Sequence, residues 1–284
     1  MTELDFRVDR DLNLFCHTLT MFPESYRSEG SAFNNPQYRK AHSHLRTKSL
    51  SDLFSKLLPL GWGDWDFVGL SLISSDTSDS SSEGRLLTAA GSLARTWSAI
   101  LKESWKGYST IWPDVESRLS QYRSRLRSDW EPISENVIRS IRRISETTWN
   151  PDNVHVYLVD CLYGGASYLT TILLAPVPDL EIEKKLLCHE LSEGAFATGN
   201  LQERLEAKGI SSDVSHTVVD TTAYVALKSW LKSEYVERLK PKQHYYVGAE
   251  SVYTAFEQSD AGSEAYKGLD GLLGIVAKEL AARS

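Results

Sequence analysis

The chain has 284 residues, of which 41% are hydrophobic and 24% charged, a composition typical of a globular protein with a sizeable core. Its formal net charge of −7 argues against a general nucleic-acid binder. No window approaches the ~18 uninterrupted apolar residues of a membrane span, and residues 1–7 lack the pattern of a signal peptide. The three cysteines are too scattered for a disulfide framework, so we expect a cytoplasmic protein.

Residues 1–150 are predicted to form a helical N-terminal region. Apolar residues recur at helical spacing over residues 12–22 and again, with several aromatic positions, over residues 85–148. Pro113 and Pro132 stand where new helices are expected to begin, because proline fits the first turn of a helix.

The pattern changes after a predicted turn at residues 149–153. Residues 154–160 alternate in polarity and are rich in β-branched side chains, which favours a strand. Gly164 and Gly165 interrupt this run, and a second apolar run over residues 168–175 ends at a proline. We therefore expect a hairpin or two adjacent strands, with a bulge or turn at the glycine pair.

The strongest chemical signal lies in residues 186–196, on a helix that the acidic residues 179–183 are expected to open. His189 and Glu193 are four residues apart, so they lie on one helical face, and Glu190 projects beside them. The pattern is that of the H-E-x-x-H zinc peptidase helix with glutamate in place of the second histidine. Two ligands at this spacing can hold one metal ion.

A second helix, expected from about Asp213 to Leu239, carries a matching pair, His216 and Asp220. If the two helices pack antiparallel, four candidate metal ligands converge, namely His189, Glu193, His216 and Asp220. A catalytic zinc site takes three protein ligands and leaves one position open. Mn²⁺ or Fe²⁺ would also suit a mixture of imidazole and carboxylate.

The order of strand, Gly-Gly loop, second strand, His-Glu helix and carboxylate-bearing helix resembles that of the gluzincin-type zinc metallopeptidases. The resemblance is best over residues 150–235. In those families a strand edge beside the metal helix binds extended substrate, and the third ligand is an acidic residue on the next helix. Asp220 stands where glutamate is usual, Glu193 replaces the second histidine, and His216 can supply the missing imidazole.

The resemblance implies a peptidase that acts on a peptide or protein substrate through a zinc-activated water, with Glu190 as general base and then acid. It also implies two further groups of residues. The substrate-binding candidates are Gly164, Gly165 and Tyr168, and the candidates for stabilising an oxyanion are His244, Tyr245 and Tyr246.

The expected fold is α+β and mostly helical. Residues 1–150 form the helical N-terminal region, and residues 151–284 form a zincin-like part with a small sheet, the metal-site helix pair and further helices near 243–258 and 263–282. Two rival interpretations stay open. One is a non-catalytic zincin-like protein whose strand edge near residues 166–175 captures a peptide or partner chain. The other is a helical scaffold in which both four-residue pairs are ordinary polar contacts.

Overall fold

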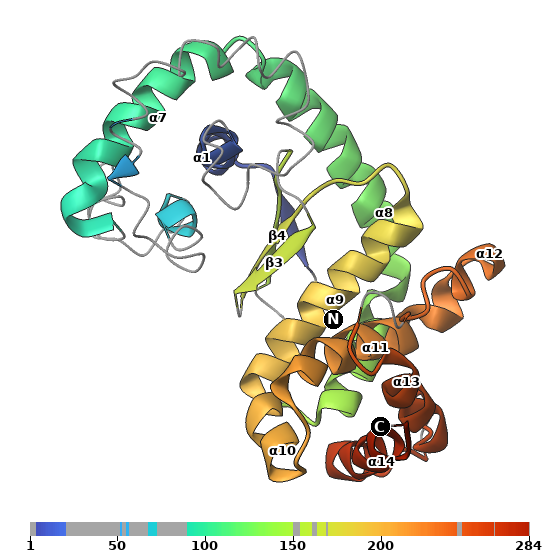
Figure 1. Ribbon diagram of the computed structural model, residues 1–284. Coiled ribbons are helices and arrows are strands. Elements are labelled where there is room, and N and C mark those ends of the chain that lie inside the picture. Colours follow the sequence, from blue (N-terminus) through green and yellow to red (C-terminus); the bar gives the residue numbers. More distant parts are fainter. Residues whose placement is uncertain are drawn as a thin grey trace. The chain divides into compact units, whose positions relative to one another are not determined.

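The computed structural model describes residues 4–20, 52, 55–56, 68–72, 90–149, 154–160, 164–168, 170–242, 246–263 and 265–283. Within these residues the protein is mostly helical and has one small four-stranded sheet, which confirms the expected α+β class (Figure 1). None of the helices in these ranges is long and apolar enough to cross a membrane.

The chain divides into two compact units. The larger unit comprises residues 1–6, 124–156 and 165–284, and the smaller unit comprises residues 7–123 and 157–164. One long helix, residues 112–145, contributes to both units, and each unit takes in more than one stretch of chain.

The smaller unit is built from helices around an aromatic core. Asp9 begins the first helix by accepting a hydrogen bond from the backbone N–H of Leu12 at 2.8 Å. Phe15 from this helix contacts Trp97 with ring centroids 4.8 Å apart, and both side chains are fully buried. Its helical elements are α1 (Arg10–Thr20), the 3₁₀ turn η3 (Gly91–Leu93), α7 (Ala94–Tyr108) and the first part of α8 (Trp112–Ser145).

Helix α8 corrects the prediction that Pro132 begins a new helix. Pro113 does stand in its first turn, but Pro132 lies inside a helix that continues to Ser145. An interior proline removes one backbone hydrogen bond and costs about 3 kcal/mol. The buried side chains of Trp130 and Ile133 keep the helical spacing across this point, so side-chain packing outweighs the loss.

The sheet has the strand order β1-β2-β4-β3, which places β3 at an edge. Strands β2 and β4, which fall in the two runs expected as strands, are neighbours in the sheet. The hairpin is instead formed by β3 and β4, antiparallel, with Gly165 opposite Leu174 and Tyr168 opposite Thr171, so Gly165 lies in a strand and not in the expected bulge or turn. Strand β1 was not expected, because three residues are too few to show a period. The strands are β1 (Asp5–Arg7), β2 (His155–Leu158), β3 (Gly165–Tyr168) and β4 (Thr171–Leu174).

Helix α9 (Leu180–Thr198) follows the hairpin and confirms the helix expected from its acidic start. The Asp179 carboxylate caps it by accepting a hydrogen bond from the Glu181 N–H at 3.1 Å. The helix is buried along most of its length, between the strands of the hairpin and helix α11 (Ser215–Leu227), as Figure 1 shows. A short helix, α10 (Leu201–Ala207), connects the two.

The prediction of a single helix from Asp213 to Leu239 is wrong, because this stretch forms four separate helical elements. Apolar residues fill every turn only as far as Leu227, and the chain becomes extended at Leu231. The pieces are η4 (Ser212–Val214), α11, η5 (Lys228–Trp230) and α12 (Ser233–Val236). The two last helices are present as α13 (Ala249–Gln258) and α14 (Leu269–Arg283), each beginning later than expected.

A buried histidine in the smaller unit predicts how stability changes with pH. His17 is fully buried against the Tyr108 ring, 3.7 Å from the Asp160 carboxylate, and burial lowers its pKa below the ordinary 6.5. The unfolded chain therefore binds a proton more readily than the folded one. We expect the free energy of unfolding to fall as the pH drops below 6.5, by up to about 1.4 kcal/mol per pH unit.

Denaturant unfolding followed by tryptophan fluorescence at several pH values measures this slope. In His17→Gln the part of the slope that belongs to His17 should disappear. Parallel curves for the two proteins would contradict the prediction.

Candidate functional site

Helix α9 places His189 and Glu193 one turn apart on the face that meets α11. The Nε2 atom of His189 lies 3.4 Å from Oε1 of Glu193. The His189 side chain is only 9% exposed, whereas that of Glu193 is 33% exposed. His189 therefore lies in the protein interior, and Glu193 lies nearer to the surface.

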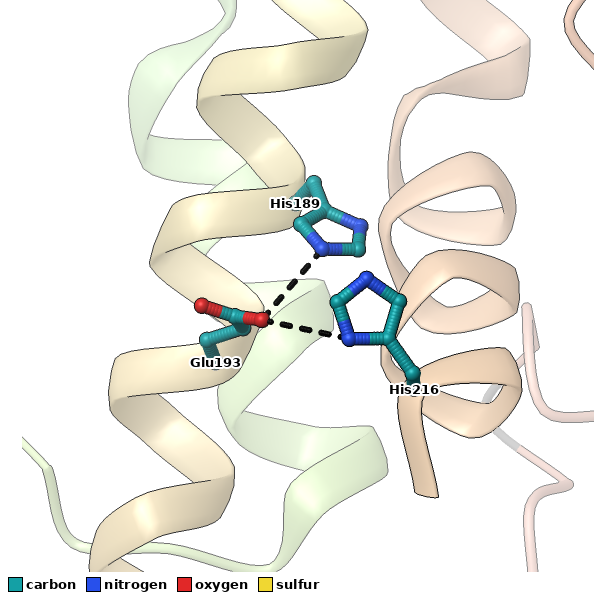
Figure 2. A group of neighbouring side chains, drawn as sticks. All are labelled: His189, Glu193 and His216. Atoms are coloured by element: carbon teal, nitrogen blue, oxygen red, sulfur yellow. Dashed lines mark ion pairs between the residues drawn. The ribbon is translucent and has the colours of Figure 1, made fainter. Parts of the chain in front are cut away.

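Helix α11 brings His216 to the same place from its first turn. Ser211 caps η4, which directly precedes α11, by accepting a hydrogen bond from the Asp213 N–H at 3.3 Å. Nδ1 of His216 lies 3.5 Å from the Glu193 Oε1 that also faces His189, and the two imidazole rings are 4.6 Å apart. In Figure 2 the Glu193 carboxylate reaches both imidazoles, His189 from its own helix and His216 from α11.

His189, Glu193 and His216 each offer one ligand atom, and these atoms all lie within 4.8 Å of one another. We call these three residues the His-Glu-His cluster. All three residues are candidate ligands predicted from the sequence, and the structure brings them together. Two imidazoles and one carboxylate are a donor set that Zn²⁺, Mn²⁺ or Fe²⁺ accepts. The His216 side chain is 57% exposed, so the cluster opens to solvent on that side.

Asp220, expected as a fourth candidate ligand, is not a member of this cluster. Its Oδ1 accepts a hydrogen bond from Nδ1 of His189 at 3.1 Å, on the side of the ring that faces away from Glu193. The same oxygen also accepts one from the ammonium of Lys185. A carboxylate bound to the second nitrogen of a ligand histidine orients the ring and fixes its tautomer. The structure thus gives Asp220 the position of an orienting partner.

The charged groups around His189 shift one another's pKa values. Burial alone would raise the pKa of Asp220, but the Lys185 charge and the His189 hydrogen bond outweigh it and hold that pKa at about 2. Burial would likewise lower the pKa of His189, yet its hydrogen bonds to Asp220 and Glu193 raise it to about 9. At neutral pH Asp220 is therefore ionised and His189 is protonated on both nitrogens, with Nδ1 donating to Asp220 and Nε2 facing Glu193. A metal bound at Nε2 would have to displace the proton there.

Glu190 lies beside the cluster and is almost entirely buried. Burial first, and then the nearby Glu193 carboxylate, raise the pKa of Glu190 to about 8. Its Oε2 atom is buried and has no hydrogen-bond partner among the described residues. A buried, unpartnered carboxyl oxygen with a raised pKa is what a group that exchanges protons near neutral pH needs.

The residues expected to bind substrate lie in strand β3 or directly before it. Gly164, at φ +72°, forms the turn that precedes β3, and Tyr168 lies at the end of that strand. Gly165 faces Glu190 so closely that a Cβ atom there would lie 2.3 Å from its Oε1. Gly165 therefore makes room for Glu190, because any larger residue would displace that side chain.

The candidates for oxyanion stabilisation fall partly outside the described residues, which do not include His244 and Tyr245. The Tyr246 ring stacks on His216 with centroids 5.9 Å apart. Burial, the Asp220 charge and a hydrogen bond to that carboxylate raise the pKa of Tyr246. Tyr246 thus stays protonated and belongs to the group around Asp220.

Two features of the site were missed from the sequence. The first is Lys185, which lies four residues before His189 and so on the same face of α9. This spacing could have indicated a role for Lys185 in the site, but its partner Asp220 lies on another helix. The second feature is a cavity of about 620 Å³ beside the cluster, lined in part by Tyr168, Glu193 and His216. Cys188 is buried with a raised pKa caused by that burial, which agrees with its prediction as a core residue.

Comparison of the chain with protein-family models, with curated proteins and with solved structures finds no match. The resemblance to gluzincin-type peptidases therefore stays a prediction from the sequence pattern.

The position of Asp220 predicts that Asp220→Asn weakens metal binding without removing it. Losing such an orienting partner typically lowers metal affinity about 10- to 100-fold. Competition with a chromophoric chelator measures the Zn²⁺ affinity, and Asp213→Asn, an exposed change in η4, is the matched control. A loss as complete as that in Glu193→Gln would instead make Asp220 a direct ligand.

Proposed function

We propose that this protein is a metal-dependent peptidase in which His189, Glu193 and His216 hold the metal and Glu190 is the general base. The observation that carries the proposal is the convergence of three ligand atoms from two helices within 4.8 Å, directly beside a buried carboxyl group. One face of the cluster opens to a cavity large enough for substrate side chains.

The donor set fits a catalytic rather than a structural metal. Three protein ligands leave a position open for a reacting group, whereas structural zinc sites are closed by four. His189 already has the outer hydrogen bond that ligand histidines usually make. A divalent metal bound here would supply a Lewis acid that polarises the scissile carbonyl.

Glu190 is placed to move the proton in hydrolysis. Its unpartnered Oε2 accepts a proton from the attacking water as the new C–O bond forms. The same carboxyl then gives this proton to the amide nitrogen as the C–N bond breaks. The raised pKa near 8 suits both steps, because the group can exist in either protonation state at neutral pH.

The edge strand β3 supports a peptide as the substrate. It pairs with β4 on one side and is the last strand of the sheet, and it runs beside α9. An extended chain can add to such an edge through backbone hydrogen bonds. Tyr168 at the end of β3 lines the same cavity as Glu193 and His216, so a chain bound along the strand would pass the cluster.

The first test is the metal content of the purified protein with and without added Zn²⁺. We expect close to one metal per chain in the wild type and none in His189→Ala, since this change removes one of three ligands. Glu190→Gln should keep the metal but lower kcat for peptide hydrolysis by at least about 100-fold, the usual contribution of a general base.

Three outcomes would contradict the peptidase. If Glu190→Gln hydrolyses peptides as fast as the wild type, Glu190 is not the general base. Metal and peptide binding without cleavage by any variant would favour the non-catalytic peptide-binding protein. If the wild type takes up no metal and a chelator leaves its thermal unfolding unchanged, the cluster is a set of polar contacts between helices.

A second test uses the contact between Gly165 and Glu190. In Gly165→Ala the new methyl group would lie within 3.0 Å of the Glu190 carboxyl, which must then move. We expect the metal content to stay unchanged and kcat to fall by at least about tenfold, since a base must stay within hydrogen-bond reach of its proton.

Gly271→Ala on α14 is the control, because a Cβ there meets nothing closer than 3.9 Å. Equal activity of Gly165→Ala and the wild type would mean that Glu190 does not take part in the reaction at this position.

A further inference from the structure

The cavity beside the His-Glu-His cluster is lined by both apolar and acidic side chains. It extends from Glu193 and His216 along α9 to the start of α10, where Glu203 lies at its wall. With a volume of about 620 Å³, it is large enough for a long side chain.

Part of the lining of this cavity is apolar. Phe196 and Val219 are buried side chains that line it, and Leu201 at the start of α10 adds a third. Gly194 also lines the cavity and adds no side chain to it. A long aliphatic stem can therefore lose its contact with water against these apolar residues, which favours binding.

The charges around the cavity have one sign. Its ionisable lining residues are Glu193, Glu203 and His216, and the described lining includes no lysine or arginine. Glu193 is engaged by the two histidines. Glu203, by contrast, makes no ion pair or hydrogen bond within the described part of the chain, so its carboxylate is available to a ligand.

We propose that this cavity binds a lysine or arginine side chain of the substrate, with the aliphatic stem on Phe196, Leu201 and Val219 and the cationic head at Glu203. This inference rests on the proposed peptidase and names its preferred substrate. Long cationic side chains bury their methylene stems along apolar surface and keep the charged end at a polar one. An acidic side chain in the same place faces the Glu203 carboxylate and is disfavoured by it.

The test compares kcat/KM for peptides that differ at one position, with lysine placed in turn at each of the two positions on either side of the cleaved bond. Norleucine replaces the lysine in one set and glutamate in another. At the position that enters the cavity we expect lysine to exceed norleucine by about fivefold, the effect of an exposed ion pair, and glutamate by at least about 20-fold. The preference over norleucine should shrink as NaCl is raised.

The Glu203→Arg variant should reverse the order, so that the glutamate peptide becomes better than the lysine peptide. Glu206→Arg is the matched control, because Glu206 is exposed on the same helix but does not line the cavity. It should keep the wild-type order. Equal rates for lysine and norleucine at all four positions, or an order unchanged in Glu203→Arg, would overturn the proposal.

Binding measurements separate this proposal from the peptidase itself. Fluorescence anisotropy with labelled lysine, norleucine and glutamate peptides is measured on the Glu190→Gln protein, which needs no cleavage. A lysine preference in binding without hydrolysis by the wild type would reject the peptidase and keep the cavity assignment. Hydrolysis with no preference, in rate or in binding, would keep the peptidase and reject the cavity assignment.

Discussion

The candidate site depends on the hydrogen bonds that the buried Asp220 carboxylate accepts. This carboxylate joins α9 to α11, because it accepts hydrogen bonds from Lys185 and His189 on the neighbouring helix. A buried charge of this kind is tolerated only when it is paired and hydrogen-bonded. Here the pairing fixes the direction in which the His189 ring presents its second nitrogen. The helix pair and the ligand geometry are therefore one structural feature.

The same polar group explains why α9 can carry so many ionisable residues inside the protein. Lys184 is paired with Glu181 at 2.9 Å, just as Lys185 is paired with Asp220. Each charge thus has a partner of opposite sign within reach, which reduces the penalty of burial. Glu190 has no lysine or arginine partner among the described residues, and burial raises its pKa to about 8. Its burial is therefore compensated by protonation and not by an ion pair.

The sequence predicted the members of the cluster but not all of their roles. The four-residue spacing places His189 and Glu193 on one face of α9, and the packing of α11 against that helix brings His216 to them. The spacing could not show which nitrogen of His189 the Asp220 carboxylate approaches, because that depends on the rotation of one helix against the other. Breaks such as that after Leu227 were also invisible, since they reflect where burial ends.

The division into units has a consequence for synthesis of the chain. Each unit is made of separated stretches, so neither can be completed until the chain has passed residue 157. The smaller unit, for example, receives Asp160, the carboxylate that pairs with Arg118 at 2.8 Å and lies near His17, only after α8 and β2 have been made. A fragment that ends at residue 123 would lack this carboxylate. The order of translation thus leaves the smaller unit unfinished until α8 and β2 have been made, and the larger unit takes in residues that are made later still.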